Sequence, residues 1–327
     1  MEDNAAYFNA RISAMKAKIF PKLTYEKMML MELPEITRYI SEGDYHQDVT
    51  ELSKNFKGID LIEYALNLNL ARTYEKLINI SSGNINRFIT QYMKRWDNEN
   101  IKSILRGLQS QASSEEIAEA IVPVGKLKFA YLLSLTKMDY ESAKRDLEEK
   151  KIIPSGIEEL KKLEYELDRN YYMDSIALAD DIGEEGLTIY LLNEVDIYNL
   201  KILLRLKGSG ADFSVIQENI IPLGKKITKE SLGKFKVMDY EESIRFANKL
   251  FDRMDLDPKE PISILEQQID NYLIRLGERV SHLNMFSTLA ALGFILRKNS
   301  EISNLRLIVR GKQLGLELGS IEKMLVV

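Results

Sequence analysis

Apolar side chains recur along this chain at the spacing of amphipathic helices. One stripe follows the i, i+3, i+4, i+7, i+8, i+11 pattern of a single helix face and consists of Ile85, Phe88, Ile89, Tyr92, Met93 and Trp96. The preceding stretch, Ser81-Ser82-Gly83-Asn84, is typical of a helix break followed by an N-cap. No convincing run of strictly alternating apolar and polar residues indicates a strand. The pattern therefore predicts an all-α fold.

Similar stripes indicate further helices before and after this one. They comprise Ile62, Leu66, Leu70, Tyr74 and Leu77, then Ile157, Leu160, Leu163, Leu167 and Tyr171, and then Leu265, Ile269, Tyr272, Leu276 and Val280, with Leu289, Leu292 and Leu296 following. These stripes fall in three segments of similar size, and each segment reads as two helices.

A sequence repeat separates these helical segments. Residues 100–106, 199–205 and 304–310 share the pattern Asn, aliphatic, basic, any residue, aliphatic, aliphatic, Arg. A weaker copy begins at Asn9. Self-similarity at a fixed period is the signature of a repeat architecture.

Two echoes follow the repeated motif. Residues 122–126 (Val-Pro-Val-Gly-Lys) match residues 221–225 (Ile-Pro-Leu-Gly-Lys). Further on, residues 138–141 and 238–241 both read Met-Asp-Tyr-Glu, and Gly43-Asp44-Tyr45 is expected to be the N-terminal version. The order and spacing of the echoes predict three related helical units.

The units are expected to span residues 52–150, residues 151–254, and residues 255–327 together with 1–51, because the last copy ends early and the N-terminal segment carries an additional one. This division predicts a closed body with pseudo-three-fold symmetry. An open α-solenoid is the alternative, since helix pairs also stack in that way. Three units are few for a solenoid, and about 100 residues is long for one of its repeats.

Composition excludes many kinds of chemistry. The chain has 327 residues, no Cys and only two His, which removes thiol nucleophiles, disulfides and Cys-based metal sites. A net charge of −5 argues against nucleic acid as a partner. The start, Met1-Glu2-Asp3-Asn4, lacks a signal-peptide pattern. The longest apolar stretch, near 289–296, is far shorter than the ~20 residues that span a bilayer. We therefore expect no transmembrane span and a cytoplasmic location.

Few motifs suggest a catalytic or ligand site. Four Gly-Lys pairs occur, at 125–126, 224–225, 233–234 and 311–312, but none has the Ser or Thr that a P-loop requires next. Asp180, Asp181 and Glu184 could share a magnesium ion, although Gly183 interrupts the helix there. An acidic loop before the next helix is the simpler interpretation.

The two histidines also lack catalytic neighbours. His46 lies in a polar, loop-like stretch, and His282 ends a predicted helix, where a cation meets the helix dipole favourably. We predict neither a catalytic residue nor a cofactor or metal site.

Basic residues recur at the same places of successive units: Lys102, Arg106, Lys201, Arg205, Arg306 and Arg310. Under pseudo-three-fold symmetry they would form rings around the axis. Two interpretations stay open. They could be solvated or form internal salt bridges, or they could contact an axial partner with an acidic or dipolar surface.

Both ends of the chain resemble one known family. Residues 7–16 resemble the start, and residues 304–312 the end, of the C-type stalk component of A-type (V-type) ATP synthases, a family that includes the d component of the eukaryotic vacuolar proton pump. The resemblance covers essentially the whole chain. One departure is Leu206, where the other copies have Gly107 and Gly311, which puts a local turn in doubt.

The resemblance implies a funnel-like, non-catalytic subunit of the central stalk. Its partners would be the soluble central shaft subunits and the membrane proteolipid ring, which would place it on the cytoplasmic face of the cell membrane as a peripheral protein. It would transmit torque during ion-driven ATP synthesis or ATP-driven ion pumping. Two alternatives remain: a helical scaffold or adaptor, and an all-α magnesium-dependent enzyme that uses Asp180, Asp181 and Glu184.

Overall fold

The computed structural model describes residues 5–252, 254–282 and 287–326. Within these ranges the chain forms α-helices and no strand, so the predicted all-α fold is confirmed. None of the helices in these ranges is long and apolar enough to cross a membrane.

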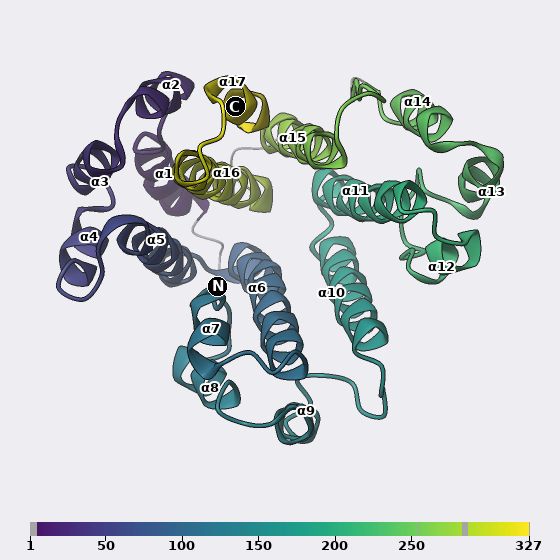
Figure 1. The fold of residues 1–327 in the computed structure, drawn as a ribbon, viewed down its shortest axis with the longest axis horizontal. Coiled ribbons are helices and arrows are strands. Elements are labelled where there is room, and N and C mark those ends of the chain that lie inside the picture. The colour runs from purple at the N-terminus through teal and green to yellow at the C-terminus, as the bar shows by residue number, and fades with distance from the viewer. Residues whose placement is uncertain (1–4, 253, 283–286, 327) are drawn as a thin grey trace.

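Six long helices form three antiparallel hairpins, one in each segment where the apolar stripes predicted two helices (Figure 1). They are α5 (Gly58–Ile80) with α6 (Gly83–Gln109), α10 (Leu160–Ile182) with α11 (Glu185–Gly208), and α15 (Ile262–Ser281) with α16 (Thr288–Gln313). Ser81 and Ser82 separate the first two helices, as expected.

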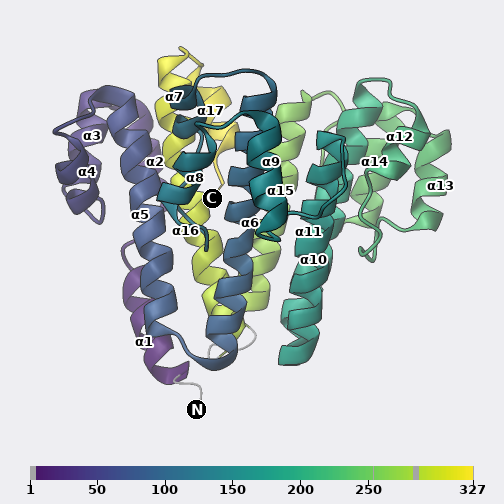
Figure 2. The ribbon, with the colours of Figure 1, turned by 90° about the horizontal axis from the view of Figure 1, so that it is seen from below.

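The second helix of each hairpin packs against the first helix of another hairpin, and we call each such contact a seam. The seams join α6 to α10, α11 to α15, and α16 to α5. Figure 2 shows the long helices side by side, with the α5–α6 turn at the lower end and most of the short helices beside their upper halves.

Short helices follow each hairpin. They are α7 (Ser114–Glu119), α8 (Phe129–Leu135) and α9 (Tyr140–Glu149) after the first, α12 (Phe213–Glu218), α13 (Lys229–Val237) and α14 (Tyr240–Leu250) after the second, and α17 (Leu318–Met324) after the third. The N-terminal segment adds α1 (Ala5–Lys16), α2 (Lys22–Leu30), α3 (Leu33–Ser41) and α4 (His46–Leu52). Its first two helices pack against α16 and its last two against α5, so this segment straddles the α16–α5 seam.

The repeated motif has the same local structure in all three places. The helices α6, α11 and α16 each end nine residues after the repeated Asn, at Gln109, Gly208 and Gln313. Leu206 therefore leaves the end of α11 unchanged, although Gly107 and Gly311 occupy the equivalent positions. A Cβ on either glycine would press against an isoleucine of the following short helix, Ile117 or Ile321.

The N-terminal counterpart of the Asp-Tyr motif differs from the expected one. Asp139 and Asp239 are the N-caps of α9 and α14. Asp44 caps no helix, because its carboxylate pairs with Lys18 at 2.9 Å. The matching cap is instead Glu32, at the start of α3, whose backbone N–H donates to the Glu35 carboxylate at 2.8 Å as that of Asp239 does to Glu242.

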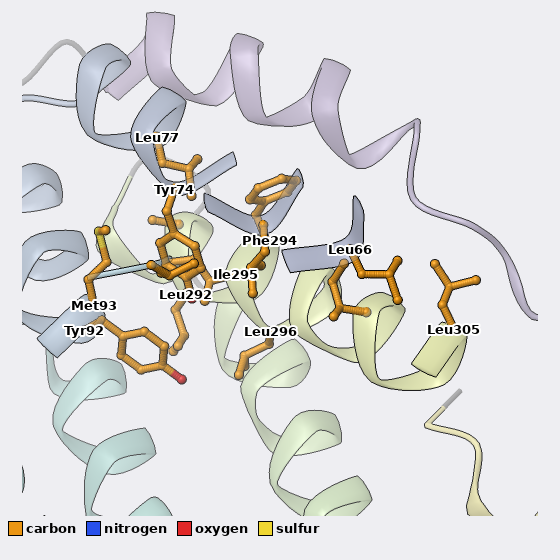
Figure 3. Packing of buried hydrophobic residues seen from close by; sticks show 14 of the residues in the cluster. Leu66, Tyr74, Leu77, Tyr92, Met93, Leu292, Phe294, Ile295, Leu296 and Leu305 are labelled. Atoms are coloured by element: carbon orange, nitrogen blue, oxygen red, sulfur yellow. The ribbon is translucent and has the colours of Figure 1, made fainter. Parts of the chain in front are cut away.

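The largest hydrophobic core joins the first hairpin to α16 and the N-terminal segment. Figure 3 shows Leu66 and Tyr74 of α5, Tyr92 of α6, and Leu292 and Phe294 of α16 converging there. Two further clusters bury the short helices that follow α6 and α11 against those helices. Burial of this kind is the main favourable contribution to folding, at roughly 25 cal/mol per Å² of apolar surface.

Candidate functional site

Each repeated asparagine holds a backbone segment 22 residues further along the chain. Asn100 donates from Nδ2 to the Val122 carbonyl at 2.8 Å and accepts from the Val122 N–H at 2.9 Å. Asn199 binds Ile221 and Asn304 binds Val326 in the same two-bond manner, at 2.7 to 2.8 Å. The three side chains are at most 2% exposed, so the amides replace water for these backbone groups.

An acidic residue precedes each of these asparagines by three positions. Asp97 accepts from the backbone N–H groups of Lys126 and Leu127 at 2.9 and 3.0 Å. Asp196 accepts from those of Lys225, Lys226 and Ile227 at 2.8 to 3.0 Å. Burial raises the pKa of both carboxyl groups, and the backbone donors oppose that shift.

These contacts explain two of the Gly-Lys pairs. A Cβ on Gly125 or on Gly224 would collide with the Oδ1 atom of Asp97 or Asp196. Gly125 also has a φ of 126°, which other residues rarely adopt. The loops therefore wrap around an internal carboxylate, which leaves no place there for a bound phosphate.

The third position of this kind is occupied by Glu301. Its carboxylate accepts from the backbone N–H of Phe20 at 2.7 Å, from the Tyr45 hydroxyl at 2.5 Å and from Lys298 Nζ at 2.7 Å. Glu301 thus binds the N-terminal segment where Asp97 and Asp196 bind their own downstream loops.

The first predicted basic pair lies on the α6–α10 seam. Lys102 Nζ lies 2.6 Å from Glu99 and 2.9 Å from Asp168 of α10. Burial opposes its charge, but the two carboxylates outweigh that effect and raise the pKa of Lys102. Arg106 binds Glu164 of α10 through two nitrogens, at 2.5 and 2.8 Å, and these hydrogen bonds raise its pKa.

The second pair repeats this arrangement on the α11–α15 seam. Lys201 Nζ lies 2.8 Å from Asp270, and Arg205 lies 2.7 Å from Glu266. Both acidic residues belong to α15, at the same helical spacing as Asp168 and Glu164 of α10.

The third pair lies on the α16–α5 seam and differs in one partner. Arg306 binds Glu63 and Asn67 of α5, each at 2.8 Å. Arg310 binds the other oxygen of the same Glu63 carboxylate at 2.8 Å, which raises the pKa of Arg310. One carboxylate on this seam therefore does what two do on each of the others.

All six basic residues thus pair with the facing helix across a seam. The three arginines of the outer positions still keep much of their side chains exposed, with 57% for Arg106, 62% for Arg205 and 57% for Arg310. Lys102 is only 6% exposed and is fully engaged inside the protein. The arginines can therefore reach a partner without leaving their carboxylates.

A cavity of about 340 Å³ lies between α5, α6, α10, α11 and α16. Arg95 lines it, stacks over the Tyr92 ring at 3.7 Å from the centroid, and binds the Tyr171 hydroxyl and the Glu194 carboxylate, both at 2.8 Å. Burial opposes the Arg95 charge, but Glu194 outweighs it and raises the pKa of Arg95 above its usual value. Such a pair is costly to break, because the remaining charge would be buried alone.

The sequence interpretation missed Arg95 and Glu194. Both lie inside strongly apolar helix faces, Arg95 beside Tyr92 and Trp96, and Glu194 next to Val195. A charged residue in such a stripe is a signal for a buried ion pair. The two partners are 99 residues apart, so the signal does not identify them as a pair.

The acidic group predicted as a possible magnesium site is dispersed. Asp180 accepts from Thr188 at 3.1 Å, Asp181 pairs with Arg87 at 2.6 Å, and Glu184 accepts from both the backbone N–H and the hydroxyl of Thr288. Gly183 ends α10 in the left-handed conformation between them. Each carboxylate therefore serves a different structural contact.

The two histidines lie at separate helix ends. His46 begins α4, is exposed and binds the Ser41 carbonyl through Nδ1 at 2.9 Å. His282 is the exposed C-cap of α15, as expected.

Comparison with known proteins identifies relatives across the whole chain. A family described as "ATP synthase (C/AC39) subunit" matches residues 8–324. The C-type component of the A-type ATP synthase of Methanococcoides burtonii is 35% identical, covering 99% of this chain and 94% of that protein. The proteins of the same name from Archaeoglobus fulgidus and Haloferax volcanii are 32% and 27% identical, and the match covers 98% and 99% of this chain and 96% and 98% of those proteins.

Proposed function

Because this chain belongs to the C/AC39 family of ATP synthase subunits, we propose that it is the central-stalk subunit that couples the soluble shaft to the membrane proteolipid ring. In this proposal it has no catalytic centre of its own. It transmits torque during ion-driven ATP synthesis or ATP-driven ion pumping. The observation that carries the proposal is the set of three bridged seams, because a torque-transmitting part must hold its helices in fixed relation.

The proposed body is closed, funnel-like and pseudo-three-fold. Equivalent basic residues cross equivalent seams, and the last long helix packs on the first. An open solenoid leaves its terminal helices without such a contact. In our proposal the axis of the funnel provides the socket for the shaft.

The three proposed units are residues 52–150, residues 151–254, and residues 255–327 with 1–51. The third unit is supported by the contact from Glu301 to Phe20, which replaces the contacts of Asp97 and Asp196 inside their own units. The helices α2 and α3 then take the places of α8 and α9. Cap residues support this equivalence, since Glu32 follows Phe20 by the same 12 residues that separate Asp139 from Leu127.

The exposed arginines are our candidate partner contacts. Their charge is only partly used by the seam carboxylates, and they recur at one level of the three hairpins. A shaft or ring with acidic or dipolar groups fits such a surface. The protein would be peripheral and bound at the cytoplasmic face of the membrane through the ring.

The test is assembly. A detergent-extracted complex is purified from cells that contain or lack this chain, and its shaft and proteolipid-ring subunits are quantified. We expect the shaft to dissociate from the ring without this subunit. A fully assembled and ion-coupled complex that lacks this chain would support the alternative, a helical scaffold without a rotary role.

A further inference from the structure

A cavity of about 350 Å³ lies where the end of α1 and the start of α2 meet the third hairpin, and it combines basic and apolar groups. Lys16, Arg275 and Arg297 line it from three different helices. Its volume is within the range of small-molecule sites.

Two of the three cations have no carboxylate partner in the ranges that the structure describes. Among the described residues, neither Lys16 nor Arg275 forms an ion pair. Arg297 binds Glu278 at 2.9 Å through Nε alone, and its outer guanidinium nitrogens make no hydrogen bond within the described part of the chain. Of the other lining carboxylates, that of Glu301 is already neutralised by Lys298. The cavity therefore has an excess of positive charge.

Lys16 lies close to Arg297 in a half-buried position. Its ammonium group lies over α16 beside Gly293, where a Cβ would be 4.0 Å from Nζ. Burial and the neighbouring Arg297 charge lower the pKa of Lys16. Two cations held together without a shared anion destabilise one another, and an anion between them relieves that repulsion.

The repeat shows that Arg297 departs from the pattern of the other units. It precedes Asn304 by seven residues, and the residues seven before Asn100 and Asn199 are Met93 and Leu192. Those two side chains are buried apolar groups, 5% and 9% exposed. The third hairpin thus has a guanidinium where the other two have hydrocarbon, so packing alone does not account for it.

We propose that this cavity binds a phosphate-sized oxyanion between Lys16 and Arg297, with Arg275 adding charge at its edge. Arg presents several donors in a fixed plane and Lys supplies a compact charge, and together these groups recognise phosphate oxygens. Apolar lining residues such as Ile19 and Ile274 leave room for a group attached to the phosphate. The oxyanion is either free inorganic phosphate or the phosphate of a lipid headgroup.

The test uses the full chain and two probes. Inorganic phosphate is titrated calorimetrically into wild type, Arg297→Met and Lys16→Met. The Arg297→Met change copies Met93 of the first hairpin and so preserves packing. The matched control is Arg245→Met on α14, which removes the same charge from an exposed arginine paired within its own helix. Flotation with phosphatidylglycerol or phosphatidylcholine vesicles tests the lipid source.

For free phosphate we expect wild type and Arg245→Met to bind alike and both cavity variants to bind at least about tenfold more weakly. For a lipid source we expect the same ranking with phosphatidylglycerol vesicles, no binding to phosphatidylcholine, and competition by inorganic phosphate. The proposal is overturned when wild type binds neither probe. It is also overturned when the cavity variants bind as well as Arg245→Met.

Discussion

Glu301 binds the backbone N–H of Phe20 at 2.7 Å, although 281 residues separate them along the chain. The same carboxylate, which is 1% exposed, also accepts from Tyr45 and pairs with the buried Lys298. One side chain thus joins α16 to two places in the N-terminal segment.

Replacing this carboxylate should weaken the whole protein. In Glu301→Gln the ammonium of Lys298 loses its anion while it stays buried, so we expect a loss of about 3–5 kcal/mol in the free energy of unfolding. Urea denaturation followed by circular dichroism measures it. Glu230→Gln is the control, because the exposed pair of Glu230 with Lys234 should contribute less than about 1 kcal/mol. Equal effects of the two changes would contradict the assignment.

The glycines of the two wrapped loops should not tolerate a methyl group. Gly224→Ala places a Cβ against Asp196, and Gly125→Ala adds an unfavourable positive φ, so each should cost about 1–3 kcal/mol. Thermal unfolding measures both. Gly233→Ala lies inside α13 with open space around the new Cβ, and it should stabilise by up to about 1 kcal/mol. A stabilising Gly224→Ala would show that the loop can move away from Asp196.

The repeated asparagines should contribute more than other asparagines on the same helices. Asn199→Ala leaves the N–H and C=O of Ile221 unpaired in the interior, which should cost about 3 kcal/mol. Asn193→Ala removes only a hydrogen bond to the Ile189 carbonyl of its own helix and should change stability by less than about 0.5 kcal/mol. Denaturant midpoints distinguish them, and similar midpoints would argue against the clamp.

The seam arginines serve either the fold alone or also a partner, and two triple variants separate these cases. One variant replaces Arg106, Arg205 and Arg310 with Gln. The other breaks the same ion pairs from the opposite side by replacing Glu164, Glu266 and Glu63 with Gln. If the arginines contact the shaft or ring, we expect only the arginine variant to lose binding in co-purification, by about tenfold or more. Equal binding by both triple variants would restrict the arginines to the seams.

Asp139 gives a pH-dependent prediction. Hydrogen bonds from the Ser142 hydroxyl and N–H lower the pKa of its carboxyl in the folded protein. The unfolded chain therefore binds its proton first as the pH falls, so this cap stabilises the fold above pH 3.8 and loses that effect as the pH falls through the lower folded value. The stability gap between wild type and Asp139→Ala should shrink across that range. Asp139→Asn, which keeps a neutral cap, should show no such trend relative to Asp139→Ala.

Much of the helical framework could be predicted from residue patterns. The stripe from Ile85 to Trp96 lies within α6, and the three copies of the Asn motif end three long helices at the same position. Helical periodicity and a repeated motif are local signals, so one sequence is enough to read them.

Other relationships could not be read locally. The N-terminal Asp-Tyr motif was assigned to Asp44, but Glu32 is the residue that caps a helix, because the third copy exchanges Asp for Glu and Tyr for Leu33. The carboxylates that face Arg106 and Arg310 lie 58 and 247 residues away. Which acidic residue a helix faces depends on how the hairpins pack, and that information is distributed over the whole chain.

The N-terminal segment, which straddles the α16–α5 seam, has a mechanical consequence in the closed body we propose. A tube that is slit along its length twists easily, whereas an intact tube resists torsion. The chain does not run directly from α16 into α5, so this seam is the slit, and α1 to α4 act as a strap across it. The torsional stiffness of the protein should therefore depend on its first 52 residues more than on any single hairpin.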